Sequence, residues 1–264
     1  MSNIVYAKRR KILGQHILID DKIIERIIKY CKINKDDVIC EMGSGTGKLT
    51  RRIAEFGNKV ESYEIDRNFF ENVRKLEDKF ANLKIINEDL LDNQNKNKDF
   101  DVFISNIPYS KSKEILLWLA TKKFRCAIIM VQKEFADKLK ITCGDPNYRA
   151  ISAICQYRFN VEKLFSVGKN AFNPVPKVES QVIRLSPRNN ADINDHNILS
   201  NDDIKKVNLF FSAKNKLLSY IIKKYNIKYN TKIIRTYIEN KARIKDLEPE
   251  IIVNLAKNCD IVVK

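Results

Sequence analysis

The sequence predicts an α/β protein with a largely parallel sheet, followed by a smaller all-α domain. Short apolar runs alternate with helix-like patterns over residues 38–185, which is typical of βαβ units. A polar stretch without apolar periodicity follows at 189–197 (NNADINDHN), and it is expected to be a linker. Beyond it, apolar residues return at helical spacing. We therefore expect one domain over residues 1–188 and a second over residues 198–264.

The individual elements are assigned from the same periodicities. The six candidate strands are residues 38–42, 59–64, 83–87, 102–105, 127–132 and 181–185. A helix is expected between the first two, because Leu49, Ile53, Ala54 and Phe56 recur at helical spacing. Three apolar groups predict helices in the tail: Ile204, Val207 and Phe211; Leu217, Leu218, Ile221 and Ile222; and Ile233, Ile234, Tyr237 and Ile238.

Charge is the most informative property of the composition. The chain has 264 residues, 44% of them hydrophobic, and 49 Lys and Arg against 33 Asp and Glu, for a net charge of +16. This excess favours a polyanionic partner such as nucleic acid. The alternative is a lysine-rich proteome encoded by AT-rich codons, which the abundance of Ile, Lys and Asn also fits.

Several classes of protein are disfavoured. Apolar runs such as residues 127–131 are far shorter than the roughly 20 residues that cross a bilayer. The basic residues 8–11 (KRRK) precede no apolar segment, so a secretory signal is not expected. The six cysteines form no C-x-x-C pair and only two histidines exist, so no metal site is predicted. We expect a soluble, cytoplasmic protein with reduced thiols.

A glycine-rich turn at residues 41–48 (EMGSGTGK) follows the first strand and opens a helix. Glycines there let a ligand approach the backbone closely. A Walker A loop is disfavoured, because Met42 stands at its first glycine and Leu49 at its Ser or Thr. A dinucleotide site is disfavoured because the third glycine comes one residue early. The spacing fits S-adenosylmethionine, with Gly43 and Gly45 as contacts, although a purely structural turn is the alternative.

Two acidic residues end the next two strands. Glu64 lies 19 residues after Gly45, where a carboxylate can accept hydrogen bonds from both ribose hydroxyls. Asp89 ends the third strand and is expected to accept from the adenine amino group of the cofactor. Together with the glycines, these positions predict a Rossmann-like methyltransferase sheet with helices on both faces.

The fourth strand runs into Asn106-Ile107-Pro108-Tyr109. This tetrapeptide suits methylation of an exocyclic amine whose lone pair is delocalised into an aromatic ring. The amide oxygen of Asn106 and a backbone carbonyl near Ile107 or Pro108 can accept both amino hydrogens and free the lone pair. Pro108 fixes the backbone, and Tyr109 offers a face on which the base stacks. A plain turn after the strand is the alternative.

These motifs and others resemble the KsgA family of ribosomal RNA adenine dimethyltransferases, including its archaeal and eukaryotic members. The resemblance spans nearly the whole chain. Its further segments are residues 14–18 (GQHIL), 132–136 (QKEFA), 144–152 (GDPNYRAIS) and 171–180 (AFNPVPKVES), with Ala242, Arg243, Leu247, Leu255 and Ala256 in the tail.

The resemblance implies transfer of two methyl groups to each of two adjacent adenines near the 3′ end of small-subunit rRNA, with S-adenosylmethionine as donor. The partner would be the small ribosomal subunit or its precursor, and the protein a monomer without a metal. Phe172 would pack against the target adenine, and Pro108 and Tyr109 would complete the catalytic set. The cofactor contacts carried over are His16, Leu18, Gly43, Glu64, Asp89 and Asn106.

The sequence also departs from the family pattern. Ile17, Met42 and Ser44 replace other residues beside the cofactor, and residues 110–114 (SKSKE) are less apolar than usual. The tail run at residues 211–216 (FSAKNK) carries fewer positive charges, which leaves RNA docking by that helix open. Two alternatives to the small-subunit enzyme remain: a resistance-type methyltransferase acting on large-subunit rRNA, and a non-catalytic ribosome-assembly or transcription factor.

Overall fold

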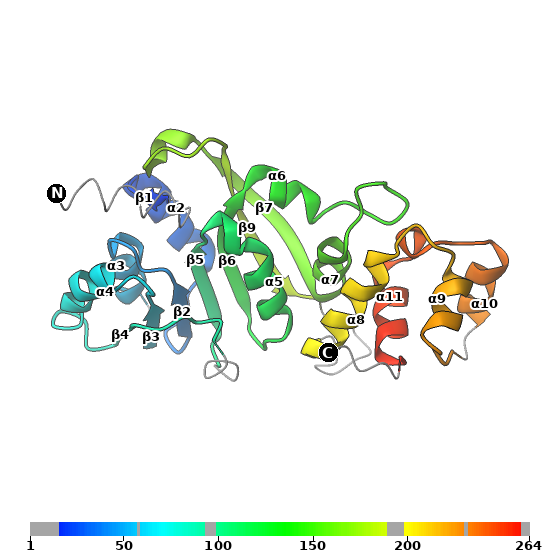
Figure 1. Cartoon of the computed structure of the whole chain (residues 1–264). Helices are drawn as coiled ribbons and strands as arrows, with labels where there is room; N and C mark the ends of the chain where they lie inside the picture. Colours follow the sequence, from blue (N-terminus) through cyan, green and yellow to red (C-terminus); the bar gives the residue numbers. More distant parts are fainter. Residues whose placement is uncertain (1–15, 57–58, 93–98, 189–197, 230–231, 260–264) are drawn as a thin grey trace. The chain divides into compact units, whose positions relative to one another are not determined.

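The computed structural model describes residues 16–259 except 57–58, 93–98, 189–197 and 230–231 (Figure 1). The basic run at residues 8–11, the first two residues of the GQHIL motif and the expected linker at 189–197 lie outside the described residues. The chain divides into two compact units, each made of several segments. Of the described residues, the first unit contains those up to Ile115, with Lys122–Ala136 and Glu162–Pro187, and the second contains Leu116–Thr121, Asp137–Val161 and those from Arg188 onward.

This division is not the one expected from composition. Residues 137–161 precede the polar stretch, yet they group with the tail. The reason is the helix α7 (Ala150–Arg158), which packs against the tail helices α8 (Asn201–Ser212) and α11 (Pro249–Lys257). Two consecutive domains separated by a linker at 189–197 therefore stay a prediction.

A seven-stranded sheet forms the centre of the first unit (Figure 1). Its spatial order is β4-β3-β2-β5-β6-β9-β7; β2, β3, β4, β5 and β6 pair in parallel, and β9 is antiparallel to β6. The predicted α/β fold class is confirmed, and all six predicted strands exist with ends shifted by at most two residues. The bounds are β2 Val38–Met42, β3 Lys59–Tyr63, β4 Leu83–Ile86, β5 Val102–Asn106, β6 Cys126–Gln132, β7 Phe159–Val167 and β9 Ser180–Pro187.

The central strands form because their residues are apolar on both sides. In β5 and β6, every residue from Val102 to Ser105 and from Cys126 to Val131 is buried. Strands covered on both faces have continuous apolar runs of this kind. Parallel neighbours also end at the same edge, so the residues that follow β2, β3, β4 and β5 lie together.

A second, two-stranded sheet pairs β1 (Ile17–Leu18) with β8 (Phe172–Asn173) in antiparallel register. Leu18 lies opposite Phe172, and Ile17 lies opposite Asn173. The backbone of Ile19 extends this pairing, since its amide donates to the carbonyl oxygen of Ala171 at 2.9 Å. Residues more than 150 positions apart are thus joined beside the main sheet.

Helices in the first unit follow from caps and amphipathic spacing. Asp20 caps α2 (Asp21–Cys31) by accepting from the amides of Lys22 and Ile23, and α2 packs against α3 (Lys48–Ala54) and β6. Asp66 caps α4 (Arg67–Val73) in the same way. The short helices η1 (Arg74–Leu76), η3 (Tyr109–Lys111) and η4 (Lys169–Ala171) also belong to this unit, whereas the residues of α5 (Ser112–Ala120) and α6 (Lys133–Lys138) are divided between the two units.

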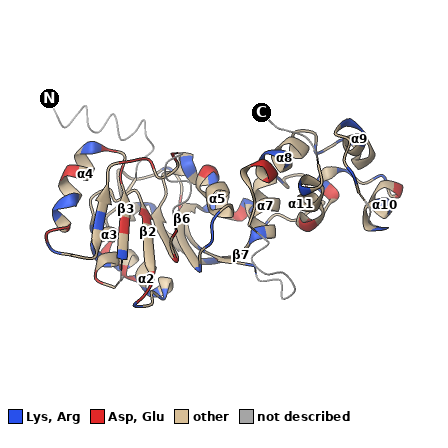
Figure 2. Cartoon of the chain, turned by 90° about the horizontal axis from the view of Figure 1, so that it is seen from below, with Lys and Arg blue, Asp and Glu red and all other residues tan. Residues whose placement is uncertain are grey.

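The tail of the second unit is helical, as predicted. Besides α8 and α11 it contains α9 (Leu218–Lys224), α10 (Lys232–Glu239) and the short η5 (Ile244–Asp246). Ser200 and Asp203 form a capping box at the start of α8. Lys and Arg positions occur in both units, for example on α4 and α9 (Figure 2). None of the helices described here has the length and apolar character needed to cross a membrane.

Candidate active site

A cavity of about 290 Å³ opens at the carboxyl ends of β2, β3, β4 and β5. Its volume lies near the lower end of the range typical of small-molecule pockets. Nine of the ten residues predicted for the site line this cavity, although they come from five separate stretches of the chain. They are His16, Leu18, Gly43, Gly45, Glu64, Asp89, Asn106, Pro108 and Tyr109.

The glycine-rich turn provides the backbone wall of the cavity. Gly43 and Gly45 have φ values of +79° and +55°, and a Cβ on either would meet no atom within 4 Å. Gly47 also has positive φ, but a Cβ there would press against Leu76 and Val73 at 3.2–3.3 Å. The first two glycines therefore leave space for a ligand, and the third allows close packing of η1 and α4.

Glu64 follows β3 and lies almost fully buried at the rim of the turn, with 3% of its surface exposed. Its Oε2 accepts from the amide of Gly45 at 2.8 Å, and its Oε1 accepts from the amide of Asp66 at 2.9 Å. Burial raises the pKa of the Glu64 carboxyl, while these amide bonds act in the opposite direction. Each oxygen keeps a lone pair, so the fixed carboxylate can accept further bonds.

Asp89 follows β4 and is only partly buried. Its Oδ1 accepts from the amide of Leu91 at 2.9 Å, which fixes the turn after the strand. The neighbouring Glu88 also lines the cavity. This part of the wall is therefore acidic, and it suits a ligand that donates hydrogen bonds.

Asn106 ends β5, and its amide group has a fixed orientation. Nδ2 donates to the carbonyl oxygen of His16 at 2.9 Å. The Oδ1 atom accepts no hydrogen bond from the described residues, so it remains an acceptor at the cavity wall. The sequence motif predicted the acceptor but not the donor contact, which joins the end of β5 to the residue before β1.

Tyr109 and His16 form an aromatic pair at the cavity. Their ring centroids lie 5.3 Å apart with an interplanar angle of 35°. The Tyr109 hydroxyl bonds to Oγ of Ser180 at 2.6 Å, and His16 Nδ1 donates to the carbonyl oxygen of Pro174 at 2.8 Å. Burial raises the pKa of Tyr109. Each ring is thus held in place by a hydrogen bond at its edge, and both rings line the cavity.

Phe172 does not line the cavity. It belongs to β8, exposes 1% of its surface and packs within the main hydrophobic core beside Leu18. Its expected contact with a target adenine stays a prediction, and that contact would require the ring to turn out of the core.

Sequence reasoning assigned no role to three further residues of the site. Lys48 and Ile65 line the cavity, and Ile65 is an exposed apolar residue with 63% of its surface accessible. Glu41 lies beneath the glycine turn with 1% exposed, and its Oε2 accepts from Oγ of Ser62 at 2.6 Å. Burial raises the pKa of Glu41 to about 7.

The sequence offered a signal for only one of these residues. Glu41 is an acidic residue within a predicted buried strand, which is unusual, whereas nothing in the sequence pattern distinguished Lys48 from other lysines.

No group of three or more His, Cys, Asp or Glu side chains suited to a metal occurs in the part of the chain that the structure describes.

Comparison with known proteins assigns the family. The family described as ribosomal RNA adenine dimethylase matches residues 6–260. A ribosomal RNA small subunit methyltransferase A from Thermotoga petrophila is 35% identical over 215 residues, which cover 80% of this chain and 79% of that protein. The protein of the same name from Natranaerobius thermophilus is 33% identical over 232 residues, which cover 79% and 76% of the two chains.

Solved structures agree with this assignment. A dimethyladenosine transferase from Plasmodium falciparum is 26% identical, has a TM-score of 0.73 and covers 91% of this chain and 96% of its own. The 23S rRNA methyltransferase ErmE shares the fold, with a TM-score of 0.61 at 23% identity over 93% of this chain and 100% of that one. The chain belongs to the ribosomal RNA adenine dimethylase family, whose members are S-adenosylmethionine-dependent methyltransferases.

Proposed function

We propose that this protein transfers methyl groups from S-adenosylmethionine to the N6 amino group of adenine in small-subunit rRNA, two on each of two adjacent adenines near the 3′ end. Family membership and the names of the relatives support the reaction and its target. The observation that carries the proposal is the orientation of Asn106, whose Nδ2 is bound to His16 while Oδ1 remains an acceptor at the cavity.

The residues of the cavity fit S-adenosylmethionine. The positive φ values and open Cβ directions of Gly43 and Gly45 leave the backbone accessible to a ligand. The Glu64 carboxylate, held by two amides, suits two ribose hydroxyls, and Asp89 suits the adenine amino group. When bound, S-adenosylmethionine supplies a sulfonium methyl that is open to in-line nucleophilic attack.

The chain's own groups activate the target amine. Oδ1 of Asn106 accepts one amino hydrogen, and a backbone carbonyl accepts the other. This second acceptor is the carbonyl of Ile107 or of Pro108; the carbonyl of Pro108 accepts from the amide of Lys111 at 2.8 Å and keeps one lone pair. Two acceptors draw the nitrogen toward tetrahedral geometry and make its lone pair nucleophilic. The amine becomes acidic as the new N–C bond forms, so its proton passes to water without a strong base.

The base itself must be held flat against the wall. The pair of Tyr109 and His16 offers an aromatic surface for an unstacked adenine. Pro108, at the start of this turn, fixes the backbone that carries both the acceptors and the tyrosine. Catalysis is then mainly positioning of the amine against the methyl group.

The alternatives are less well supported. The relatives at 33–35% identity are named for the small subunit, whereas the large-subunit enzyme is similar at the level of fold. A non-catalytic assembly factor would not require the oriented acceptor of Asn106. The proposal includes a cytoplasmic monomer that needs no metal and binds the small subunit or its precursor.

The test is incubation of the protein with labelled S-adenosylmethionine and separated small and large ribosomal subunits, followed by mapping of the modified base. We expect dimethyladenosine in small-subunit RNA. Asn106→Ala is the control that must lose the label. Label confined to large-subunit RNA would reject the proposed target, and the absence of label from both would reject the reaction.

A further inference from the structure

His16, Ile17 and Leu18 form one wall of the cavity without belonging to the main sheet, and Ile19 continues this segment. Three sets of contacts hold them. The pairing of β1 with β8 holds one backbone edge, the Nδ2 of Asn106 holds the carbonyl of His16, and the ammonium group of Lys48 holds the carbonyl of Ile19. The first attaches the segment to β8, the second attaches it to the end of β5, and the third attaches it to the start of α3, directly after the glycine turn.

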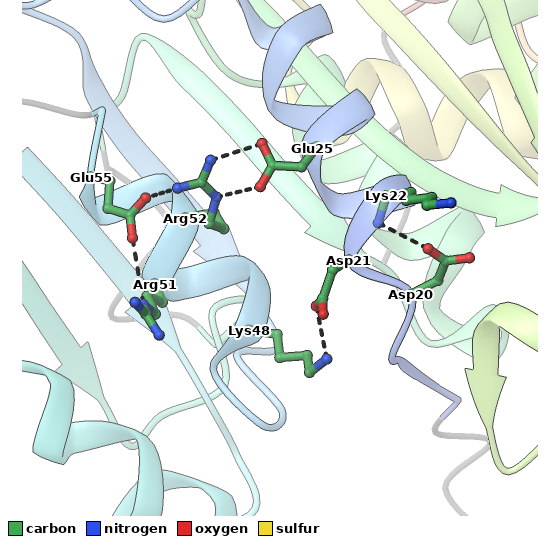
Figure 3. Close-up of polar contacts among 8 residues, drawn as sticks. All are labelled: Asp20, Asp21, Lys22, Glu25, Lys48, Arg51, Arg52 and Glu55. Atoms are coloured by element: carbon green, nitrogen blue, oxygen red, sulfur yellow. Dashed lines mark hydrogen bonds and ion pairs between the residues drawn. The ribbon is translucent and has the colours of Figure 1, made fainter.

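Lys48 is the first residue of α3 and directly follows Gly47. Its Nζ donates to the carbonyl oxygen of Ile19 at 3.0 Å and to Oδ1 of Asp21 at 2.8 Å. Figure 3 shows the lysine reaching from the start of α3 to the carboxylate at the start of α2. One cation therefore joins the helix that follows the glycine turn to the segment that follows His16, Ile17 and Leu18, and both stretches contribute residues to the cavity lining.

The contact lies at the surface. The side chains of Lys48 and Asp21 are 43% and 78% exposed, so water and salt reach them. Exposed pairs of this kind contribute little to global stability. They can open without disturbing the core, which suits a contact that forms and breaks with each binding event.

A neighbouring ion pair provides an internal control. Arg52 of α3 pairs with Glu25 of α2, with Nε to Oε1 at 2.6 Å and Nη2 to Oε2 at 2.8 Å (Figure 3). This pair joins the same two helices, one helical turn further along each. It makes no contact with Ile19, so it links the helices but not the cavity wall.

We propose that Lys48 is a positioning residue that, through Ile19 and Asp21, latches residues 16–19 against the glycine turn and slows release of S-adenosylmethionine. This inference rests on the proposed function, because it assumes that the cofactor occupies this cavity. The latch does not touch the reacting atoms. The latch affects only how long residues 16–19 stay held against the glycine turn.

The test measures dissociation rates of S-adenosylmethionine and of S-adenosylhomocysteine by rapid-mixing displacement. Lys48→Gln and Asp21→Asn should each release both ligands about two- to fivefold faster, which is the range expected for one exposed ion pair. Glu25→Gln removes an equivalent carboxylate from α2 and should leave both rates unchanged. Lys48→Arg, which keeps the cation, should stay close to the unaltered protein.

The direction in which each substitution changes the release rate distinguishes a latch from a simple charge effect. S-adenosylmethionine carries a net positive charge, so through electrostatics alone Lys48→Gln would strengthen its binding and Asp21→Asn would weaken it. A latch predicts faster release in both variants, and to the same extent for the neutral S-adenosylhomocysteine. The double variant should release the ligand no faster than either single variant, because both disrupt one contact.

Salt gives a readout that does not depend on how the variants fold. Raising the ionic strength should speed release from the unaltered protein toward the rate of Lys48→Gln, whose own rate should change little. Opposite shifts in the two variants, equal effects of Glu25→Gln and Asp21→Asn, or unchanged rates would each overturn the latch while cofactor binding itself stands. Failure of the unaltered protein to bind S-adenosylmethionine would instead reject the proposed function and the latch together.

Discussion

The side-chain amide of Asn106 donates to the backbone carbonyl of His16, 90 residues earlier in the chain, at 2.9 Å. This bond does two things at once. It fixes which atom of the amide points to the cavity, and it holds the residue that pairs with Tyr109. The group proposed to accept the target amine is therefore joined directly to the part of the cavity wall that His16 forms.

Asn106→Ala should lower the rate of methyl transfer on the order of 100-fold or more, because an acceptor that strengthens in the transition state is lost. It should also weaken S-adenosylmethionine binding, since His16 loses its donor. Single-turnover kinetics measure the first effect, and calorimetry measures the second.

Asn106→Asp separates the two roles. The aspartate keeps an acceptor oxygen but presents a second oxygen, not a donor, to the carbonyl of His16. Weaker cofactor binding in Asn106→Asp with a smaller loss of rate than in Asn106→Ala is the expected pattern. Near-normal turnover by a folded Asn106→Ala protein would remove Asn106 from the mechanism.

Glu64→Ala should weaken S-adenosylmethionine binding before it affects chemistry. Loss of hydrogen bonds to a charged group costs about 1.5–3 kcal/mol, which corresponds to about a ten- to hundredfold rise in Kd. Part of the effect comes from the glycine turn, whose amide at Gly45 loses its acceptor. Glu64→Gln keeps one acceptor oxygen, so its Kd for S-adenosylmethionine should lie between those of the unaltered protein and Glu64→Ala. An unchanged Kd in calorimetry would show that the ribose does not meet this carboxylate.

Glu41 predicts a specific dependence of stability on pH. Burial raises its pKa from 4.5 to about 7 in the folded protein. Between these values the folded state binds more protons than the unfolded state, so the free energy of unfolding falls as pH rises through the window. The stability is fully present below pH 4.5 and is lost as pH rises through about 7.

Glu41→Gln, an uncharged isostere, removes this dependence. The stability of the unaltered protein relative to Glu41→Gln should fall by about 3 kcal/mol between pH 4.5 and 8. Urea unfolding of both proteins at several pH values measures the difference. Parallel curves would mean that the carboxyl ionises normally.

The sheet could be predicted because its strands are apolar runs buried on both faces. Residues 38–42 and 102–105 gave β2 and β5 with their ends within one residue. The site followed from them, since Glu64, Asp89 and Asn106 end parallel neighbours and must lie at one edge. Each of these residues could be identified from the strand just before it, even though the three lie far apart along the chain.

Other features arise only from tertiary packing. Strand β7 was missed because exposed Glu162 and Lys163 interrupt its alternation. The two-residue strands β1 and β8 carry no periodicity, and they exist because Leu18 and Phe172 meet across the fold. α7 is buried on nearly every side, so it lacks an amphipathic pattern. The bonds of Lys48 could not be predicted, because a lysine after a glycine turn does not reveal which carbonyl it reaches.

Phe172→Ala should destabilise the protein by about 3–5 kcal/mol, as expected for a large aromatic side chain removed from a core. The ring exposes 1% of its surface and packs beside Leu18, so β1 should loosen as well. Phe56→Ala is the matched control, because Phe56 is 50% exposed and should cost well below 1 kcal/mol. Chemical unfolding of the two variants measures both. A small loss in Phe172→Ala would indicate that the ring leaves the core readily enough to reach a target base.

The last prediction concerns RNA binding by the helical tail, in which at least one lysine already makes a hydrogen bond within the protein. Lys214, in the run with diminished charge, donates its Nζ to the carbonyl of Pro146 at 2.7 Å and so braces the loop before α7. Deleting the tail would remove α8 and α11, which pack against α7, so truncation would disturb the core of that unit as well as any RNA contact.

Substitution of exposed lysines avoids this problem. Lys223 and Lys224, in the last turn of α9, are both exposed. If each neutralises one phosphate, Lys223→Gln with Lys224→Gln should lower the slope of log binding constant against log salt by about 1.5. The control changes net charge equally on the first unit, at the exposed Lys75 and Lys79. Binding to isolated small subunits at several salt concentrations measures both pairs. A slope that falls in the α9 pair alone places phosphates on α9; equal slopes in all three proteins would mean that α9 makes no phosphate contact, and equal falls in both pairs would indicate attraction by net charge alone.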